Sequence, residues 1–185
     1  MVIKSAILCI SCACCVAAGN NAYAASDGES LEYAIKAAYL YKFGLYVDWP
    51  PTAFAASTSA INLCIAGADP FGMDLDTAIR GQQINGRPIE IHRIKNVGRD
   101  SGCHILYLGP GNTQEASQAL DAMRGNGVLT VSDMPGVGII NFVIQGDRVR
   151  FVIDEEAAAQ NGLAISSKLL SLAVNVRPRQ TGIRR

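Results

Sequence analysis

Between residues 61 and 173, short apolar runs rich in β-branched side chains alternate with segments whose apolar residues recur at helical spacing. This alternation favours an α/β fold, a single layered domain in which helices flank a mostly parallel sheet. Gly146-Asp147 separates the last two runs and suits a tight II′ turn, so the sheet should finish in a C-terminal antiparallel hairpin. The predicted strands are 61–66, 88–94, 103–108, 128–132, 138–144 and 149–153.

A helical pattern also precedes the first predicted strand. Leu31 and Ile35 begin an apolar stripe just after Ser30, a residue type that often caps helices. Pro50 and Pro51 lack the backbone N–H that a helix interior needs, so we expect them to end this helix. The predicted helices are 30–47, 70–79, 113–124, 155–161 and 165–173.

The N-terminus has the three parts of a secretory signal. Lys4 supplies the positive start, residues 6–18 form an apolar stretch, and Ala22-Tyr23-Ala24 is a small-x-small cleavage site. An apolar run of about 13 residues is too short for a transmembrane helix, which needs roughly 20. We therefore predict a signal peptide at 1–24 and one mature domain at 25–185.

Export with cleavage decides which of the six cysteines remain in the mature protein. Only Cys64 and Cys103 follow the predicted cleavage site, and an oxidising compartment favours a disulfide between them. This bridge would close a loop of about 40 residues and restrict the unfolded chain by roughly 4 kcal/mol. The alternative is a pair of buried free thiols. The remaining cysteines, which have metal-like spacing, would leave with the signal: Cys9, Cys12, Cys14 and Cys15.

The charge balance argues against a nucleic-acid partner. The chain has 16 basic and 16 acidic residues, whereas nucleic-acid-binding domains carry a basic excess or a basic stripe. Arginines do gather at residues 177–185, but this segment ends the chain and has the composition of a solvated tail. The alternative for that tail is contact with anionic lipid headgroups.

Side chains that could carry catalysis are few. After the predicted signal the chain has two histidines, His92 and His104, and alternation along a strand places His104 on the opposite face from Cys103. No Gly-x-Ser-x-Gly elbow occurs, and Ser166 precedes Lys168 at the wrong distance for a Ser-x-x-Lys pair. We therefore predict that the protein is not an enzyme and has neither catalytic residues nor a metal site.

The Gly-Pro-Gly turn at 109–111 lies between a predicted strand and a predicted helix, where a dinucleotide-binding loop would lie. A full motif needs a third glycine at the position of Gln114, and the proline stiffens the loop. Asn112, with Glu115 three residues later, instead predicts a helix cap. The sequence therefore predicts no cofactor.

Several short motifs occur together in a recognisable order. They are KAAYLYKF at 36–43 followed by Trp49-Pro50, LCI at 63–65, DPFG at 69–72, CHIL at 103–106, and the long segment 128–170. Over residues 31–173, this series resembles the YfiR-like family of small exported bacterial proteins. The resemblance implies a periplasmic regulatory protein instead of a catalyst.

The resemblance also implies partners. The best-known family member binds the periplasmic sensor domain of an inner-membrane diguanylate cyclase and inhibits it, which lowers cyclic-di-GMP signalling and biofilm formation. A similar negative regulator is expected here, as a homodimer, with an outer-membrane lipoprotein that relieves the inhibition. The alternative function is a periplasmic small-ligand sensor or binding protein that uses the cleft of the same α/β fold.

The partner surface is predicted in the most recognisable motif. Arg148 and Arg150 alternate with apolar residues, so both should share one face of the hairpin. A second candidate surface comprises Tyr41, Lys42 and Trp49, because aromatic residues are enriched at interfaces. The predicted contact residues of the first surface are Arg148, Arg150, Glu156, Leu163, Ile165 and Lys168.

Overall fold

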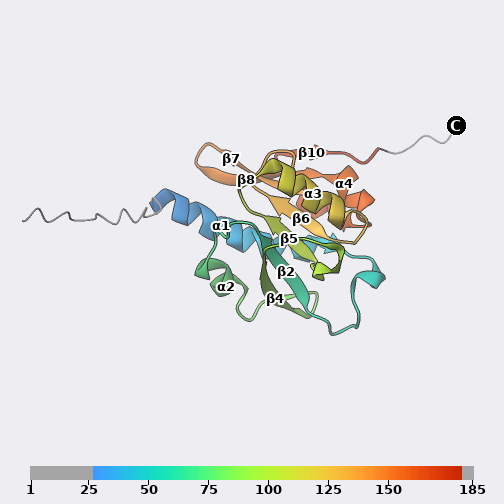
Figure 1. The fold of residues 1–185 in the computed structure, drawn as a ribbon. Coiled ribbons are helices and arrows are strands. Elements are labelled where there is room, and N and C mark those ends of the chain that lie inside the picture. Colours follow the sequence, from blue (N-terminus) through green and yellow to red (C-terminus); the bar gives the residue numbers. More distant parts are fainter. Residues whose placement is uncertain (1–26, 181–185) are drawn as a thin grey trace, which may run out of the picture.

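The computed structural model describes residues 27–180, so the predicted signal peptide at 1–24 lies outside the described residues. Within the described range, eight strands form one sheet (Figure 1). They are β2 (Ile61–Ala66), β3 (Gln83–Ile84), β4 (Arg87–Ile94), β5 (Ile105–Leu108), β6 (Leu129–Ser132), β7 (Ile140–Gln145), β8 (Arg148–Asp154) and β10 (Asn175–Arg177).

The sheet is mostly parallel. From edge to edge the strand order is β10-β8-β7-β6-β5-β2-β4-β3, and the neighbours from β7 to β4 are all parallel. β7 and β8 form the antiparallel hairpin, in which Gln145 pairs with Arg148 across the turn. Gly146 has a φ of +60°, a backbone conformation that glycine adopts without strain. The predicted α/β class and the C-terminal hairpin are therefore confirmed.

Helices and a two-stranded ribbon complete the described part of the chain. The helices are α1 (Asp27–Phe43), α2 (Met73–Ile79), α3 (Thr113–Met123), α4 (Glu155–Gln160) and α5 (Ser167–Leu170), with 3-10 turns at Gly44–Tyr46, Pro51–Ala53 and Arg99–Ser101. In the ribbon, β1 (Val47–Asp48) pairs antiparallel with β9 (Ala164–Ile165). The ribbon joins the segment after α1 to the segment before α5.

The first helix ends earlier than its pattern predicts. α1 stops at Phe43, and the next three residues form a 3-10 turn, whereas the prediction continued the helix to Val47. A Cβ atom on Gly44 would lie 2.7 Å from Ile84 Cδ1, so the chain approaches the sheet more closely here than a larger residue allows. Packing against the sheet therefore ends α1 before the two prolines are reached, and Val47 joins the β1–β9 ribbon.

Two further helices are shorter than predicted. α2 begins after a turn in which Asp69 Oδ1 accepts hydrogen bonds from the N–H groups of Phe71 and Gly72. α5 begins after Ile165, which pairs with the β1 strand instead of continuing a helix. In both places a local hydrogen bond or a distant strand competes with the helical pattern.

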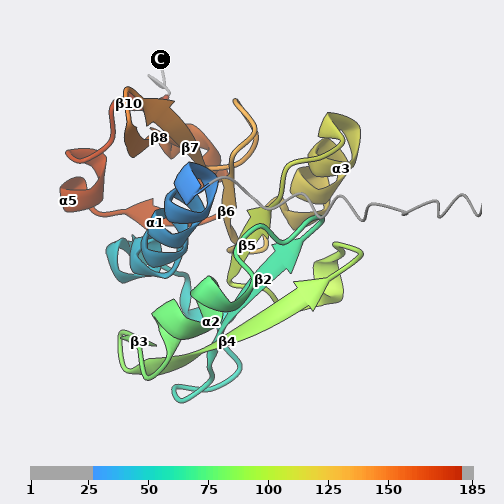
Figure 2. The same cartoon turned by 90° about the vertical axis from the view of Figure 1, so that its left-hand side faces the viewer.

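Helices cover both faces of the sheet (Figure 2). α1 and α2 lie on one face and α3 lies on the other. Alternation along the strands then divides the interior into two hydrophobic cores. In the α1-side core, the rings of Phe43 and Phe151 are 5.0 Å apart. In the α3-side core, Met123 of α3 is buried in one cluster with Leu106 of β5.

Candidate functional site

The two arginines of the predicted partner surface lie on one face of β8. Arg148 and Arg150 are exposed, whereas Val149 and Phe151 are buried in the α1-side core. Phe151 contacts Tyr39 of α1 with ring centroids 6.0 Å apart. Alternation along β8 therefore directs both guanidinium groups away from α1, to the opposite face of the sheet.

Glu156 lies in the first turn of α4, just beyond the end of β8. Its carboxylate accepts hydrogen bonds from the Gln180 N–H at 2.8 Å and from Gln160 Nε2 at 3.2 Å. The Gln180 bond is the main cause that lowers the pKa of Glu156, because it stabilises the ionised form. Arg148 stands at the far end of β8, which has 7 residues and spans about 20 Å. Glu156 and Arg148 therefore belong to separate patches.

Leu163 corrects the predicted surface. Its side chain is 2% exposed and packs in the α1-side core, because an apolar residue just after α4 is covered by that core. Leu163 is therefore a core residue and does not reach a partner. Ile165 is half-buried in β9, and Lys168 is exposed on α5. α5 packs through Leu169 into the α1-side core, so Lys168 and the two hairpin arginines belong to different sides of the sheet.

The second predicted surface is largely buried. Tyr41 is 8% exposed and belongs to the α1-side core, and Trp49 is half-buried against the same core. Ala37, Leu40 and Tyr41 stand at positions i, i+3 and i+4, so all three lie on the buried side of α1. The prediction of an exposed Tyr41 is therefore wrong, and Lys42 is the exposed member of the set.

A disulfide joins Cys64 of β2 to Cys103, which precedes β5. The Cα atoms of the two residues are 5.8 Å apart, and both side chains are buried in the α3-side core. The structure therefore confirms the predicted pair, and the alternative of two free thiols is set aside. The bridge links the two adjacent central strands of the sheet.

His104 has a structural role. Its Nδ1 accepts a hydrogen bond from the Asn62 N–H at 3.0 Å, so Nε2 carries the proton and donates to the Ala53 carbonyl oxygen, also at 3.0 Å. The ring stacks on Phe54 with centroids 4.7 Å apart. Burial lowers the pKa of His104, which keeps the ring neutral. Both ring nitrogens therefore hold backbone groups in place.

A buried charged network, which the sequence patterns do not reveal, fastens α1 to the sheet. Lys36 is 4% exposed, and its ammonium group lies 3.1 Å from Asp133 Oδ2 and 2.5 Å from Glu32 Oε1. The Tyr107 hydroxyl donates to the same Asp133 oxygen at 2.9 Å. The ring of Tyr33 lies 4.6 Å from the ammonium group. The i,i+4 spacing of Glu32 and Lys36 is the signal that would have pointed to part of this network.

The network lies at the carboxyl ends of β5 and β6. Burial, assisted by the nearby Asp133 carboxylate, raises the pKa of Tyr33 to about 12 and also raises the pKa of Tyr107. Both phenols therefore remain neutral at physiological pH. Because desolvating a buried ion pair offsets much of its attraction, we interpret the network as fixing the position of α1.

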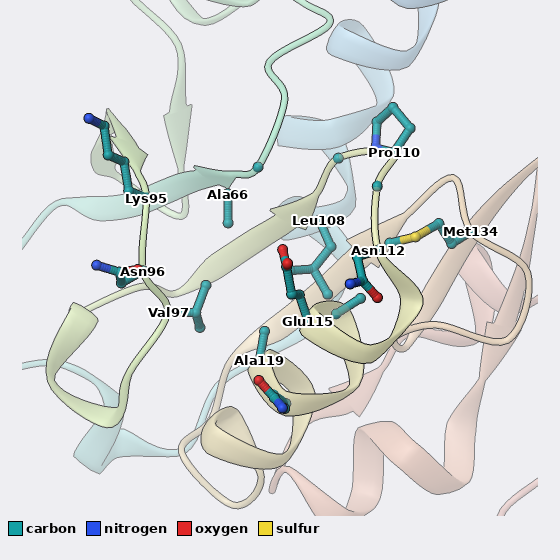
Figure 3. A pocket seen from close by; sticks show the side chains of 15 residues that line it. Ala66, Lys95, Asn96, Val97, Leu108, Pro110, Asn112, Glu115, Ala119 and Met134 are labelled. Atoms are coloured by element: carbon teal, nitrogen blue, oxygen red, sulfur yellow. The ribbon is translucent and has the colours of Figure 1, made fainter.

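On the α3 side, a cleft of about 300 Å³ opens at the carboxyl ends of β2, β4 and β5 (Figure 3). β2 leads through α2 toward β4, and β5 leads through α3 toward β6. The chain therefore leaves two neighbouring strands in opposite directions. Open α/β sheets bind ligands at a switch point of this kind.

The cleft has an apolar floor, to which Leu108 contributes, and a polar rim. Figure 3 shows Glu115 reaching from the first turn of α3 into the cleft, while Lys95 points outward from the rim. Asn112 caps α3, because its Oδ1 accepts a hydrogen bond from the Gln114 N–H at 2.8 Å. The cap predicted at Asn112 is therefore confirmed. The carboxylate of Glu115 favours a ligand that carries hydrogen-bond donors or positive charge.

The profile of the YfiR/HmsC-like family matches residues 33–174. That range begins in α1 and ends just before β10, so it contains the disulfide, the cleft, the hairpin and all of the buried network except Glu32. The chain belongs to the YfiR/HmsC-like family. Membership confirms the resemblance that the sequence motifs carry. No curated protein matches the chain.

YfiR/HmsC-like proteins are regulatory proteins of the periplasm, and the family points to control of a diguanylate cyclase. Among residues 27–180, no helix combines the length and the apolar character that a membrane crossing requires. The same part of the chain contains no group of three or more His, Cys, Asp or Glu side chains that would hold a metal ion.

Proposed function

We propose that this protein is exported to the periplasm and inhibits an inner-membrane diguanylate cyclase by binding its periplasmic sensor domain. The result is lower cyclic-di-GMP signalling and less biofilm. The observation that carries this proposal is the YfiR/HmsC-like match over residues 33–174. Residues 1–24 are proposed to be the signal peptide that directs export, and residues 25–185 the mature regulatory domain.

The contacts of the potentially reactive side chains support binding over turnover. Cys64 and Cys103 are bonded to each other, and both ring nitrogens of His104 hold backbone groups. The ammonium group of Lys36 is paired with two carboxylates. Nucleophilic and general-base catalysis need such groups to be available to a substrate. We therefore propose a stoichiometric inhibitor.

The proposed contact surface has two patches. Arg148 and Arg150 form one on the hairpin, and Glu156, Ile165 and Lys168 surround α4 and α5. β10 is the edge strand next to β8, so the two patches flank that edge of the sheet. A single partner domain that touches both patches would wrap around the β10 edge.

The family resemblance also supports two further partners. We propose that the protein forms a homodimer. We propose in addition that an outer-membrane lipoprotein relieves the inhibition, which rests on the resemblance alone.

Titration of the full-length cyclase tests the proposed function. The cyclase is reconstituted in lipid nanodiscs, and its rate of cyclic-di-GMP synthesis is measured as this protein is added. We expect the rate to fall in proportion to added protein and to level off at a fixed molar ratio. Inhibition at trace amounts, or none at all, contradicts the proposal.

Charge-reversal variants test the contact surface in the same assay. Arg148→Glu with Arg150→Glu should weaken the inhibition. The matched control is Arg99→Glu with Arg124→Glu, which makes the same change in net charge at two exposed arginines outside both patches. Equal loss in both variants would show that net charge, not this contact, is responsible.

The cleft supports a second candidate function, a periplasmic small-ligand sensor or binding protein. Its position at the switch point of the sheet and its size of about 300 Å³ suit a small molecule. Mass spectrometry of protein purified from the periplasm tests this function. A mass excess under native conditions that disappears on denaturation supports it, and equal native and denatured masses in protein from ligand-rich growth contradict it.

A further inference from the structure

Several amide groups that would bind an anion at the cleft on the α3 side are already used or missing. Phosphates at such positions bind to free N–H groups of a glycine-rich loop and a helix N-terminus. Here the Gly109 N–H donates to the Ala66 carbonyl oxygen at 3.0 Å, and Pro110 has no N–H. The Gln114 N–H, at the start of α3, is already bonded to the side chain of Asn112. The loop and the helix end therefore do not form a complete anion site.

The charge inside the cleft is negative. Glu115 reaches into the cleft from α3, and within residues 27–180 its carboxylate forms no hydrogen bond or ion pair. By contrast, Asp69 and Asp76 are both paired with Arg93 on the other side of the sheet. A helix N-terminus carries about half of an elementary positive charge, whereas an ionised carboxylate carries a full negative charge. Glu115 therefore outweighs the dipole of α3, and the cleft favours a cation.

An organic cation fits the cleft better than a metal ion does. Of the described residues that line the cleft, Glu115 alone is acidic. A single carboxylate is a poor site for Ca²⁺ or Mg²⁺, each of which needs about six oxygen ligands or more. Lys95 is exposed at the rim and points outward, so its ammonium group lies away from the interior (Figure 3). A ligand with one positive charge can reach Glu115, whereas a polyamine would bring further positive charge toward Lys95.

The floor of the cleft determines the rest of the ligand. Leu108 is 4% exposed and Ala119 is 8% exposed, and both belong to the α3-side core. At the mouth, a Cβ atom added to Gly67 or Gly111 would meet no other atom within 4 Å, so these glycines leave the entrance open. The volume of about 300 Å³ is at the lower end of the range for small-molecule sites. A short apolar body therefore matches the floor and the size.

We propose that the cleft binds a small monoamine, a ligand whose single ammonium group pairs with Glu115 and whose apolar body lies on Leu108 and Ala119. This inference rests on the small-ligand function, the second candidate above, and names the class of its ligand. Hydrogen bonds between an ammonium group and a carboxylate are about twice as strong as neutral ones. The head group of the ligand should therefore decide its affinity.

Three probes that share one phenylethyl body test the head group. They are 2-phenylethylamine, the neutral 2-phenylethanol and the anionic 3-phenylpropionate, and their binding to the mature protein is measured by isothermal titration calorimetry. The amine should bind with one site per chain. The dissociation constants of the alcohol and the acid should be higher by about 10-fold or more, because both lack the charged donor. Equal affinity of the three probes, or tighter binding of the acid, overturns the inference.

A charge-neutral variant tests the proposed ammonium partner. Glu115→Gln keeps the size of the side chain and should raise the dissociation constant of 2-phenylethylamine by about 10-fold or more. Glu90→Gln is the matched control, because it makes the same change at an exposed position of β4 outside the cleft. Equal melting temperatures of the two variants show that both fold. Equal loss of amine binding in both would assign the effect to net charge and overturn the inference.

Lys95→Met gives a change of the opposite sign. Removal of a like charge from the rim should tighten amine binding by about 2-fold at low salt. Weaker amine binding in this variant would mean that Lys95 holds a negative group of the ligand, which contradicts a monoamine.

Native mass spectrometry of protein purified from the periplasm separates this inference from the function on which it rests. A retained ligand that contains one amine and no acidic group supports both. A retained ligand that is neutral or anionic leaves the small-ligand function in place and overturns only the monoamine. If the protein retains no ligand and binds none of the three probes, both the monoamine and the small-ligand function are refuted.

Discussion

The α1-side core contains a cluster of aromatic rings, whereas α3 contributes mostly alanines to the core on the other face. Phe43, the last residue of α1, contacts both Phe142 and Phe151, and Lys36 forms a buried ion pair with Asp133 on the same side of the sheet. The α3-side core is smaller, contains the disulfide, and borders an open cleft. The α1-side core is stabilised by the area of its packed side chains, and the α3-side core by the disulfide bond.

The difference shows how one sheet can support a densely packed core on one face and a smaller core beside a cleft on the other. Large apolar side chains stabilise a core through the area that they remove from water, which small alanines cannot match. A disulfide adds stability mainly by restricting the unfolded chain, so it does not need a large core around it. We therefore expect variants on the two sides to respond differently to loss of charge, reduction and acid.

The largest effect on stability is expected from Lys36→Met. Removal of the ammonium group leaves the buried Asp133 carboxylate without its counter-charge, which typically costs about 3 to 5 kcal/mol. The free energy of unfolding, measured by urea denaturation, should fall by that amount. Lys42→Met is the matched control, since it makes the same change at an exposed position of α1 and should stay within about 0.5 kcal/mol.

A second substitution separates charge from packing. Asp133→Asn in the Lys36→Met background removes the unpaired charge, so part of the lost stability should return. If Lys36→Met is as stable as the wild-type protein, the network does not fasten α1, and the two sides of the sheet do not differ in this way.

Removal of the disulfide should have a somewhat smaller effect. Cys64→Ala with Cys103→Ala is expected to cost about 2 to 4 kcal/mol, because the unfolded chain regains the freedom of the closed loop. Hydrogen exchange should also accelerate in α3 more than in α1, because the bridge lies in the α3-side core. Uniform acceleration in both helices would mean that the two cores open together.

Acid should lower the stability of the protein through His104, which stacks on Phe54 beside the α1-side core. Burial lowers the pKa of His104 below its ordinary 6.5, so the unfolded chain takes up a proton at higher pH than the folded protein. This contribution to stability is complete above pH 6.5 and is lost as the pH falls through the lowered pKa. Urea denaturation from pH 7.5 to 5 should therefore show a decline.

His104→Gln should reduce the steepness of that decline, whatever its effect on stability at neutral pH. His92→Gln is the matched control, because it makes the same replacement at the exposed histidine of β4. An unchanged slope in His104→Gln would assign the acid sensitivity to other groups.

The smallest effect on stability is expected outside both cores. Glu156→Lys reverses the charge of a partly exposed side chain and should leave the free energy of unfolding nearly unchanged. On the proposed contact surface, it should nevertheless release the cyclase in a pull-down with the periplasmic sensor domain. Retained binding with an unchanged thermal melt would exclude Glu156 from the contact.

Patterns along the sequence predict the strands better than the contacts between them. The apolar run at 61–66 predicts β2 with its observed ends, and Gly146-Asp147 predicts the hairpin, because both signals are local. The early end of α1 depends instead on Gly44 approaching Ile84, a residue of the distant strand β3. Local sequence patterns do not predict such a close approach between distant residues.

The functional residues also differ in whether local sequence patterns predict their positions. The alternation of Arg148 with its neighbours correctly predicts an exposed arginine, because burial along a strand has a period of two. Lysine is rarely buried, so the sequence gives little reason to place Lys36 inside the protein. Its contact with Asp133 depends on the packing of α1 across the ends of β5 and β6, which is a property of the completed fold.

The β1–β9 ribbon has a consequence for the order in which the protein is made and moved. Val47 pairs with Ile165, so a segment near the start of the mature chain completes its partnership only with a segment near its end. Contacts between such distant residues form late, because a long loop must first close. If the signal peptide proposed above directs export of an unfolded chain, the N-terminal part completes its final structure only after nearly all of the chain has crossed the membrane. On that proposal, folding is completed after secretion.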